Sequence, residues 1–501
     1  DSVASRGLGD VYKRQVCNCA GRDKPQVFPR PLMVGHSRDF IKENFTMTST
    51  YDVVVLGAGS GGYATALRAS QLGMKVALIE GDKVGGTCLH RGCIPTKAML
   101  HVAETVDAIK EASRLGVKAS FEGVDMHEVG RFRDKTISRL HKGLQGLVKA
   151  RKIDYIQGWG RVISPNTVQV GSETYQGKNL VLATGSYSKS LPGLEIEGRV
   201  ITSDQALQLD WVPNKAVVLG GGVIGIEFAS LWASLGSEVT VIEGLPHLAN
   251  NEDASVSKGL ERAFRSRGIA FKTGTMFDSV TQTGNSVQVK TQGGDTFDAD
   301  VLLVAVGRGP RTKDMGFEDI GVNIDRGFIP VDDHLMTNVP GVYAVGDIVP
   351  GLQLAHRGFA QGIFLAEYLG GLDPAPLVEH NIPRVTFCEP EIASVGLTQK
   401  QAEEEFGKDG VKVTEYNLAG NGKSQILGTG GIIKLVAQKD GPIVGFHALG
   451  KRVGELVGEG QLMVNWEAFP EDLAALVHTH PTQDEAIGEA GMALAGKPLH
   501  S

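Results

Sequence analysis

Residues 51–80 read YDVVVLGAGSGGYATALRASQLGMKVALIE, in which two apolar runs flank a glycine-rich turn and a segment of helical periodicity. The pattern predicts a buried strand, a phosphate-binding turn, a helix and a second strand that ends at Glu80. Gly57 permits the tight turn, Gly59 lets a pyrophosphate approach the backbone, and Gly62 lets the helix pack on the sheet. Glu80 is then placed to accept hydrogen bonds from a ribose hydroxyl.

A second copy of this pattern lies at residues 215–243, KAVVLGGGVIGIEFASLWASLGSEVTVIE. Its key positions are offset from those of the first copy by one constant number of residues; they are Gly220, Gly222, Gly225 and Glu243. A single glycine motif is weak evidence, because glycine turns are common in α/β proteins, but two complete units at one offset predict two dinucleotide sites. In the second site Glu243 would repel a 2′-phosphate, and no arginine follows it closely, so NAD is favoured over NADP.

The composition limits the class of protein. A chain of 501 residues is expected to form about three domains. The net charge of −7, with acidic and basic residues interspersed, argues against a nucleic-acid partner. The longest apolar runs, such as residues 301–306, have the length of a strand and predict no membrane span. Five cysteines without framework spacing, and no secretory apolar segment, indicate a reducing compartment.

Residues 1–46 lack apolar periodicity, and we expect them to be an unstructured extension outside the fold. Their basic residues would suit a transit peptide, whereas their acidic residues would not. A cloning or translation extension before a start at Met33 or Met47 is an equally good interpretation.

A pair of cysteines, Cys88 and Cys93, lies within residues 85–97, GGTCLHRGCIPTK. A metal clip is disfavoured because a zinc site as a rule needs four ligands, and outside residues 1–46, where Cys17 and Cys19 receive no role, no second cysteine pair is present. A structural disulfide is disfavoured in a reducing compartment. Since the pair follows the first nucleotide unit closely, a redox dithiol beside a flavin is the preferred interpretation. The two positions point apart in an ideal helix, so a bridge needs an irregular first turn, a place that Pro95 suits.

His480 precedes Pro481, and a residue before proline is kept out of helical conformation, so we expect the histidine on a turn. Glu485 could fix one tautomer of the ring and stabilise its charged form. The alternative is a surface turn without a role.

Together these motifs resemble those of the pyridine nucleotide–disulfide oxidoreductases of class I. The resemblance extends over roughly residues 47–501 and is greatest to members that oxidise dihydrolipoyl groups with NAD. Further motifs that carry it are ATG at 183–185, VGRGP at 306–310, VYAVGD at 342–347 and HTHPTQDEA at 478–486.

The resemblance implies an α/β fold with two Rossmann-like three-layer domains, one for FAD and one for NAD, and a C-terminal α+β dimerisation domain. The expected bounds are 47–190 for the FAD-binding domain, 191–310 for the NAD-binding domain, 311–380 for a central domain that completes the FAD site, and 381–501 for dimerisation.

Roles for individual residues also follow from the resemblance. Cys88 resembles the interchange thiol that meets the substrate, and Cys93 the thiol that contacts the flavin. Lys97 matches a lysine near the reactive nitrogen of the flavin, and Glu227 matches its ion-pair partner. His480 resembles the catalytic base, which is held by Glu485. In the family this histidine reaches the disulfide of the other subunit. Further implied cofactor contacts are Gly160, Ala183, Thr184, Gly185, Gly307 and Asp347, the last on the ribityl chain.

The implied function is the oxidation of protein-bound dihydrolipoyl groups to the lipoyl disulfide, with reduction of NAD. The implied partners are a second subunit, lipoyl domains with the subunit-binding domain of an acyltransferase, or a lipoylated glycine-cleavage protein. The expected compartment is the cytoplasm, or the mitochondrial matrix in a eukaryote. The alternatives are another NAD(P)H-dependent disulfide reductase of the same fold and a nucleotide-binding scaffold with a vestigial redox site. No metal and no role for Arg357 are predicted, and Cys388 is expected to be a packed thiol.

Overall fold

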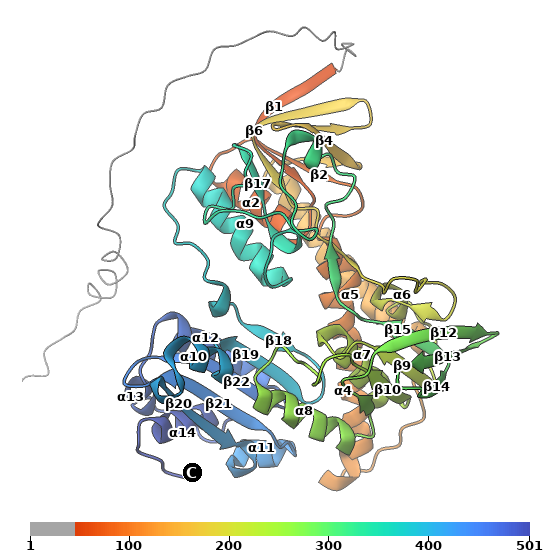
Figure 1. Cartoon of the computed structure of the whole chain (residues 1–501), viewed down its shortest axis with the longest axis vertical. Coiled ribbons are helices and arrows are strands. Elements are labelled where there is room, and N and C mark those ends of the chain that lie inside the picture. Colours follow the sequence, from red (N-terminus) through yellow and green to blue (C-terminus); the bar gives the residue numbers. More distant parts are fainter. Residues whose placement is uncertain (1–45, 501) are drawn as a thin grey trace, which may run out of the picture. The chain divides into compact units, whose positions relative to one another are not determined.

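The structure is a computed structural model that describes residues 46–500. The extension expected over residues 1–46 therefore lies outside the described residues, except that Thr46 begins strand β1. The described residues contain three main sheets with their covering helices (Figure 1).

The first sheet contains the first nucleotide unit and has the strand order β3-β2-β1-β6-β5-β4, with β17 paired to β6. Val53 and Val55 face the core that helices α2 and α9 cover, whereas Val54 and Leu56 face the opposite core, because side chains alternate along a strand. Both faces are buried, which explains the unbroken apolar run. The bounds are β1 Thr46–Leu56, α2 Ser60–Gln71, β2 Val76–Glu80, β3 Asp154–Gln157, β4 Gly160–Ser164, β5 Thr167–Val170, β6 Glu173–Leu182, β17 Val342–Ala344 and α9 Ala355–Leu369.

Residues 311–380, which the sequence assigns to a central domain, share the core of this first sheet. Strand β17 runs parallel to β6, with Val342 opposite Leu180, and α9 packs beside α2 (Figure 1). The segment thus adds a strand and a covering helix to the first sheet, because its apolar residues are buried there.

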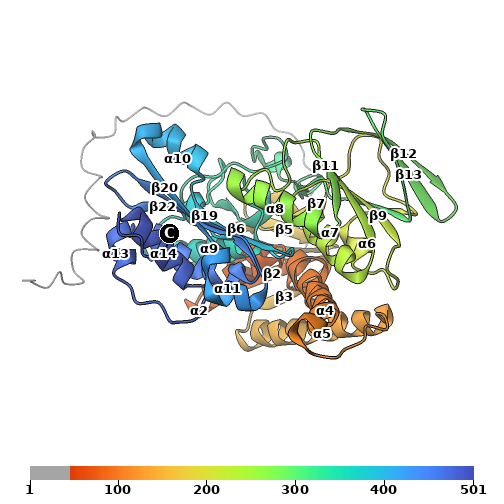
Figure 2. The ribbon, with the colours of Figure 1, turned by 90° about the horizontal axis from the view of Figure 1, so that it is seen from below.

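Along the chain, three helices lie between β2 and β3. They are α3 Gly86–Arg91, α4 Cys93–Glu111 and α5 Met126–Ala150. Helices α4 and α5 lie side by side (Figures 1 and 2), and α4 also packs against helix α7 (Val223–Leu235) of the second unit. The helix that begins with Cys93 therefore contacts both nucleotide units.

The second sheet has the order β11-β10-β9-β15-β8 and repeats the arrangement of the first. As β2 lies between β3 and β1, so β10 lies between β11 and β9, and all these pairs are parallel. Strands β12, β13 and β14 form a separate antiparallel sheet in that order. The bounds are β8 Val200–Ile201, α6 Ser203–Ala206, β9 Lys215–Leu219, β10 Glu238–Ile242, α8 Ala254–Ser266, β11 Ala270–Lys272, β12 Phe277–Thr283, β13 Ser286–Thr291, β14 Thr296–Ala299 and β15 Val301–Val304. The expected pair of Rossmann-like units is confirmed.

A short antiparallel ribbon joins the two units. Strand β7 (Ser186–Ser188) leaves the first unit and pairs with β16 (Arg308–Pro310), which returns from the second. This ribbon brings the chain segments that follow β6 and β15 together.

The C-terminal part forms an antiparallel sheet of order β18-β19-β22-β21-β20 with helices on it. Its main core is apolar and separate from the cores of the nucleotide units. The bounds are β18 Arg384–Thr386, β19 Glu391–Gly396, α10 Gln399–Phe406, β20 Val411–Asn417, α11 Gly422–Leu427, β21 Ile432–Gln438, β22 Ile443–Gly450, α12 Val457–Asn465, α13 Pro470–Ala474 and α14 Glu485–Leu494. The expected α+β C-terminal domain is therefore present.

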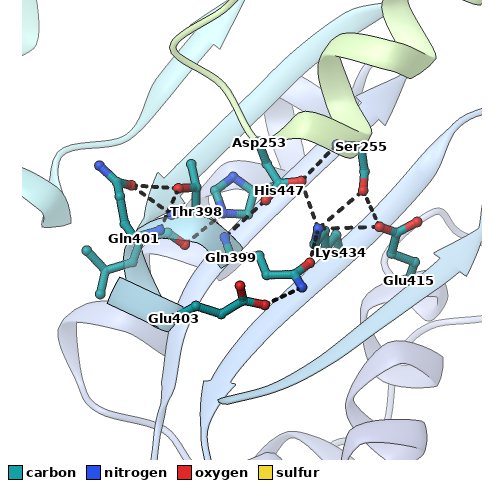
Figure 3. A network of polar contacts seen from close by, with 10 residues as sticks. Asp253, Ser255, Thr398, Gln399, Gln401, Glu403, Glu415, Lys434 and His447 are labelled. Atoms are coloured by element: carbon teal, nitrogen blue, oxygen red, sulfur yellow. Dashed lines mark hydrogen bonds and ion pairs between the residues drawn. The ribbon is translucent and has the colours of Figure 1, made fainter. Parts of the chain in front are cut away.

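A polar network centred on the buried residues Lys434 and Asp253 connects this sheet to the start of α8 (Figure 3). Lys434 Nζ on β21 lies 2.8 Å from Asp253 Oδ1 and also donates to Gln399 Oε1 at 2.8 Å and to Ser255 Oγ at 3.2 Å. Glu415 Oε1 is a further anionic neighbour at 3.4 Å. We call these five residues the Lys434 network; it fixes the C-terminal sheet against the second nucleotide unit.

Among residues 46–500, no helix is both long and apolar enough to cross a membrane. The same residues contain no cluster of three or more histidine, cysteine, aspartate or glutamate side chains that could hold a metal ion.

Candidate active site

The glycine turns of the two nucleotide units have the same backbone geometry. Gly57 has φ 104° and Gly220 has φ 110°, a region that favours glycine. A Cβ on Gly57 would clash with the carbonyl oxygen of Ala183, and one on Gly220 with that of Ala305. Each first glycine is thus required both for its backbone angle and for its close approach to the neighbouring strand end.

The second and third glycines differ in their surroundings. A Cβ on Gly59 or Gly222 would meet nothing within 4 Å, and both residues cap a helix start, where free N–H groups favour an anion. A Cβ on Gly62 would clash with the carbonyl oxygen of Gly57, so the helix can lie close to the turn. The open space before each helix fits a pyrophosphate.

The two acidic residues at the ends of the second strands hold their own glycine turns. Glu80 Oε2 accepts from Ala58 N at 2.7 Å, and Glu243 Oε2 accepts from Gly221 N at 2.5 Å. The other oxygen accepts a second backbone N–H in each case, at 2.8 Å for Glu80 and 2.7 Å for Glu243. Carboxylate oxygens have further lone pairs, so both groups can still accept from a ribose hydroxyl.

Two cavities adjoin these turns. The first, of about 310 Å³, is lined by Gly57, Gly59 and Glu80 and continues past Gly160 and residues 183–185. The second is a cleft of about 1700 Å³ that follows the second turn and reaches the C-terminal domain. Its lining includes the sequence-predicted residues Gly220, Gly222, Glu243 and Gly307.

Asp347 lies where the first unit meets the ribbon between the units. Its Oδ2 accepts a hydrogen bond from Ser186 Oγ at 2.5 Å, and Arg308 Nε donates to the same hydroxyl at 2.7 Å. Burial lowers the pKa of Arg308, while the charge of Asp347 opposes that shift. The neighbouring Thr184 donates to Arg311 O at 2.5 Å, which fixes the end of β6.

The cysteine pair spans a break between two helices. Cys88 lies in α3 and Cys93 begins α4, while Gly92 between them has φ −137° and ψ −114°. The irregular turn that a bridge needs therefore falls at Gly92, and Pro95 follows inside the first turn of α4.

Both thiols are free and partly buried. The Cys88 thiol donates a hydrogen bond to Cys93, which together with the charge of Lys97 lowers the pKa of Cys93 to about 7. The same hydrogen bond, with burial, raises the pKa of Cys88. The pair thus favours a thiolate at Cys93 and a neutral thiol at Cys88.

Lys97, one turn after Cys93, is held by a buried carboxylate. Its Nζ lies 2.8 and 2.9 Å from the two oxygens of Glu227 on α7. Glu227 also accepts from Phe387 N at 2.9 Å, and the Phe387 ring lies 4.7 Å from the ammonium. Phe387 was missed by the sequence, because only the tertiary structure brings the C-terminal domain to this ion pair.

His480 lies on a turn before α14, and its ring is exposed. Its Nδ1 donates to Glu485 Oε1 at 2.8 Å, while Glu485 Oε2 accepts from Thr482 N at 2.8 Å. That backbone bond, with the His480 contact, lowers the pKa of Glu485. Within the described part of one chain no hydrogen bond joins His480 to Cys88 or Cys93.

A second histidine of the same turn was not singled out by the sequence. His478 Nε2 donates to Glu459 Oε1 at 2.9 Å, and this bond raises the pKa of His478. The ring also lies against Gly488 of α14, where a Cβ would be 2.5 Å from Nδ1. His478 therefore anchors the turn that carries His480; its nearness in sequence to that residue was the available signal.

Two residues without a predicted role are buried. Arg357 donates from Nε to Glu379 Oε1 at 2.6 Å and also bonds backbone carbonyls near Asp347. Cys388 is buried beside Pro390, and burial raises its pKa, as expected for a packed thiol.

Comparison with known proteins agrees with this geometry. Residues 51–362 match the family described as pyridine nucleotide-disulphide oxidoreductase, and residues 382–491 match the dimerisation domain of that family. The dihydrolipoyl dehydrogenase of Bacillus subtilis is 38% identical over 91% of this chain and 100% of its own length. A mitochondrial dihydrolipoyl dehydrogenase of Arabidopsis thaliana is 38% identical over 90% of this chain and 91% of its own length.

Among solved structures, the crystal structure of LpdA from Mycobacterium tuberculosis superimposes with a TM-score of 0.82 at 25% identity. The superposition covers 88% of this chain and 99% of the other. With two nucleotide units, a cysteine pair beside the first of them and matches over both parts of the chain, this protein belongs to the pyridine nucleotide-disulphide oxidoreductase family.

Proposed function

We propose that the chain is a dihydrolipoyl dehydrogenase, which oxidises protein-bound dihydrolipoyl groups to the lipoyl disulfide and reduces NAD. The observation that carries the proposal is the placement of the cysteine pair: Cys88 and Cys93 flank the break between α3 and α4, directly after the first nucleotide unit, and Lys97 follows one turn later in its ion pair with Glu227. The names of the relatives in Bacillus subtilis and Arabidopsis thaliana support the dihydrolipoyl substrate.

The proposed chemistry is thiol–disulfide exchange. A substrate thiolate attacks the Cys88 sulfur of the oxidised pair, breaks the bond to Cys93 and forms a mixed disulfide with Cys88. The second substrate thiolate then attacks the substrate sulfur and displaces Cys88, so the substrate loses two electrons and the pair gains them. A leaving thiol with a low pKa departs faster, which suits Cys93 with its pKa of about 7.

His480 is the proposed base. A free dithiol is mostly protonated near neutral pH, so a base must take the proton before attack. The contact with Glu485 orients the ring through Nδ1 and leaves Nε2 for the substrate thiol. Because His480 is exposed and bonds neither cysteine within its own chain, we propose that it serves the pair of a second subunit in a homodimer; the dimerisation-domain match supports this.

FAD, when bound, would take the two electrons from the reduced pair and pass them to NAD as a hydride. We propose that FAD lies along the first turn and cavity, held by Gly57, Gly59, Gly62, Glu80, Gly160, Ala183, Thr184, Gly185 and Asp347. NAD would lie in the second cleft, held by Gly220, Gly222, Gly225, Glu243 and Gly307. The positive charge of Lys97, held by Glu227, would favour an anionic reduced flavin.

The proposed donors are separate chains. Lipoyl domains of 2-oxoacid dehydrogenase complexes, with the subunit-binding domain of their acyltransferase, or a lipoylated glycine-cleavage protein would supply the dithiol. The proposed compartment is the cytoplasm, or the mitochondrial matrix in a eukaryote.

Anaerobic mixing of the purified protein with dihydrolipoamide and either NAD or NADP tests the proposal. NADH formation with NAD, and little reduction of NADP, is the expected result. A flavin-containing protein that gives no turnover would refute the substrate assignment, and faster reduction of glutathione disulfide by NADPH would favour the alternative reductase. His480→Gln should slow dithiol oxidation by orders of magnitude while NADH still reduces the flavin.

A further inference from the structure

Two large apolar side chains remain exposed beside the nucleotide sites. Trp159 is 66% exposed and Met276 is 56% exposed. Each follows the edge strand of its sheet, β3 in the first unit and β11 in the second. These strands pair in parallel with β2 and β10, the strands that lead to Glu80 and Glu243. The two side chains thus occupy corresponding places in the repeated unit.

Trp159 lies directly over the residue that follows the first acid. A Cβ on Gly81 would be 2.5 Å from Trp159 Cδ2, so the absence of a side chain at Gly81 admits the indole. Trp159, Gly81 and Glu80 all line the first cavity. The indole therefore borders the space next to the carboxylate.

Met276 has the same relation to the second acid. A Cβ on Gly244 would be 2.9 Å from Met276 Sδ, and Gly244 follows Glu243. Met276, Gly244 and Glu243 line the second cleft together. In both units, therefore, an exposed apolar side chain lines the cavity beside the acid; it carries an indole in the first unit and a thioether in the second. We call each of these side chains a wall of its site.

The acid of such a unit accepts from a ribose, and the base attached to that ribose lies beyond it. An exposed apolar side chain at that point is suited to a flat adenine, which stacks on aromatic rings and contacts soft sulfur. We propose that Trp159 is the adenine wall of the FAD site and Met276 the adenine wall of the NAD site. This inference rests on the proposed function for the identity of the two nucleotides.

The two side chains differ in the contact surface that they offer to an adenine. An indole offers a large rigid stacking surface, whereas a thioether chain is flexible and narrower. We therefore expect loss of Trp159 to weaken nucleotide binding more than loss of Met276.

The first test measures FAD binding to apoprotein, without turnover. Trp159→Ala should weaken FAD binding about 5- to 150-fold, the range for loss of one base-stacking contact. Trp159→Phe should retain most of the affinity. Ile163→Ala is the matched control and should bind FAD as the wild type does, because Ile163 is an exposed apolar residue on β4, the strand that follows Trp159 in the chain, and lies outside the cavity. Equal affinity of Trp159→Ala and wild type would overturn the assignment.

A second readout uses ADP, which carries the adenine end alone. ADP should quench part of the tryptophan emission of the wild-type apoprotein, and Trp159→Phe should abolish that part. Quenching of equal size in Trp159→Phe would contradict the stacking.

For the second wall, Met276→Ala should raise the KM for NAD about 4- to 15-fold, as expected for loss of one or two buried methylene-sized groups. Its kcat at saturating NAD and its flavin content should match those of the wild type, and Met276→Leu should restore the KM. An unchanged KM in Met276→Ala would refute this wall. If the wild type lacked dehydrogenase activity, NADH binding followed by fluorescence would still decide the point; a wild type that bound no flavin would refute the proposed function itself.

Discussion

Replacing Lys434 with methionine should destabilise the contact between the C-terminal sheet and the second nucleotide unit. Lys434 and Asp253 are 3% and 2% exposed, and their charged atoms are 2.8 Å apart. Lys434→Met keeps the chain length of the side chain but leaves the Asp253 carboxylate buried without its cation. Two backbone N–H groups remain as its donors, Ser255 N at 3.0 Å and Gln399 N at 3.1 Å. Removal of one partner from a buried pair costs about 3–5 kcal/mol.

The double variant Lys434→Met/Asp253→Asn should recover part of this loss, because the amide nitrogen that replaces one oxygen cannot accept the hydrogen bond from Gln399 N. The substituted amide carries no charge, and its side-chain oxygen can still cap α8, since asparagine is among the best N-cap residues. For a cooperative unit of roughly 150–250 residues, about 3–5 kcal/mol corresponds to a decrease in Tm of roughly 6–20 °C.

Thermal unfolding followed by far-UV circular dichroism measures this effect in the wild type and both variants. Lys412→Met is the matched control, because the Lys412–Asp440 pair lies in the same domain, 3.4 Å apart, with both side chains exposed. Its loss should cost at most about 1 kcal/mol. A Lys434→Met protein that melts with the control, or a double variant no more stable than the single one, would refute the role of the buried pair.

Three further predictions concern the site. Cys88→Ala should raise the pKa of Cys93 from about 7, because the hydrogen bond from Cys88 is the main cause of its lowering. A pH titration of the thiolate absorbance at about 240 nm in the reduced protein measures this pKa. An unchanged midpoint would show that the hydrogen bond is not the cause. The pKa of His478 is raised, so its bond to Glu459 stabilises the fold below about pH 6.5 and loses that effect as pH rises through the raised pKa. The Tm difference between the wild type and Glu459→Gln should therefore shrink as pH rises from about 6.5. A Tm difference that stays constant would contradict the charged pair. Glu243→Ala should raise the KM for NAD about 10- to 100-fold, since it removes a charged acceptor. It should also decrease the preference of the enzyme for NAD over NADP. Steady-state kinetics with both nucleotides measures this preference, and an unchanged ratio would refute the role of Glu243.

The repeated nucleotide unit could be predicted because its information is local. A strand, a glycine turn and a helix follow one another within thirty or so residues, and the turn needs glycine for backbone reasons that hold in any context. Gly57 and Gly220 therefore have nearly the same φ, and the strands around them pair in the same order.

The pairing of Lys97 with Glu227 was expected only from the family resemblance. These residues are 130 positions apart, and no periodicity connects them. The bond between Ser186 and Asp347 was not expected at all, because it depends on the ribbon that joins the two units. Side-chain partners of this kind come from separate elements, so spacing along the chain does not reveal them.

The sequence by itself determined the two nucleotide units, the cysteine pair after the first of them and the turn that carries His480, because each depends on backbone rules acting over a few residues. Only the tertiary structure decided that residues 311–380 join the first sheet, that Phe387 lies over Lys97 and that Lys434 is buried against Asp253. Those outcomes depend on which apolar faces pack together. Polar groups that are buried between these faces must then form hydrogen bonds or ion pairs with one another, because a buried polar group without a partner is destabilising.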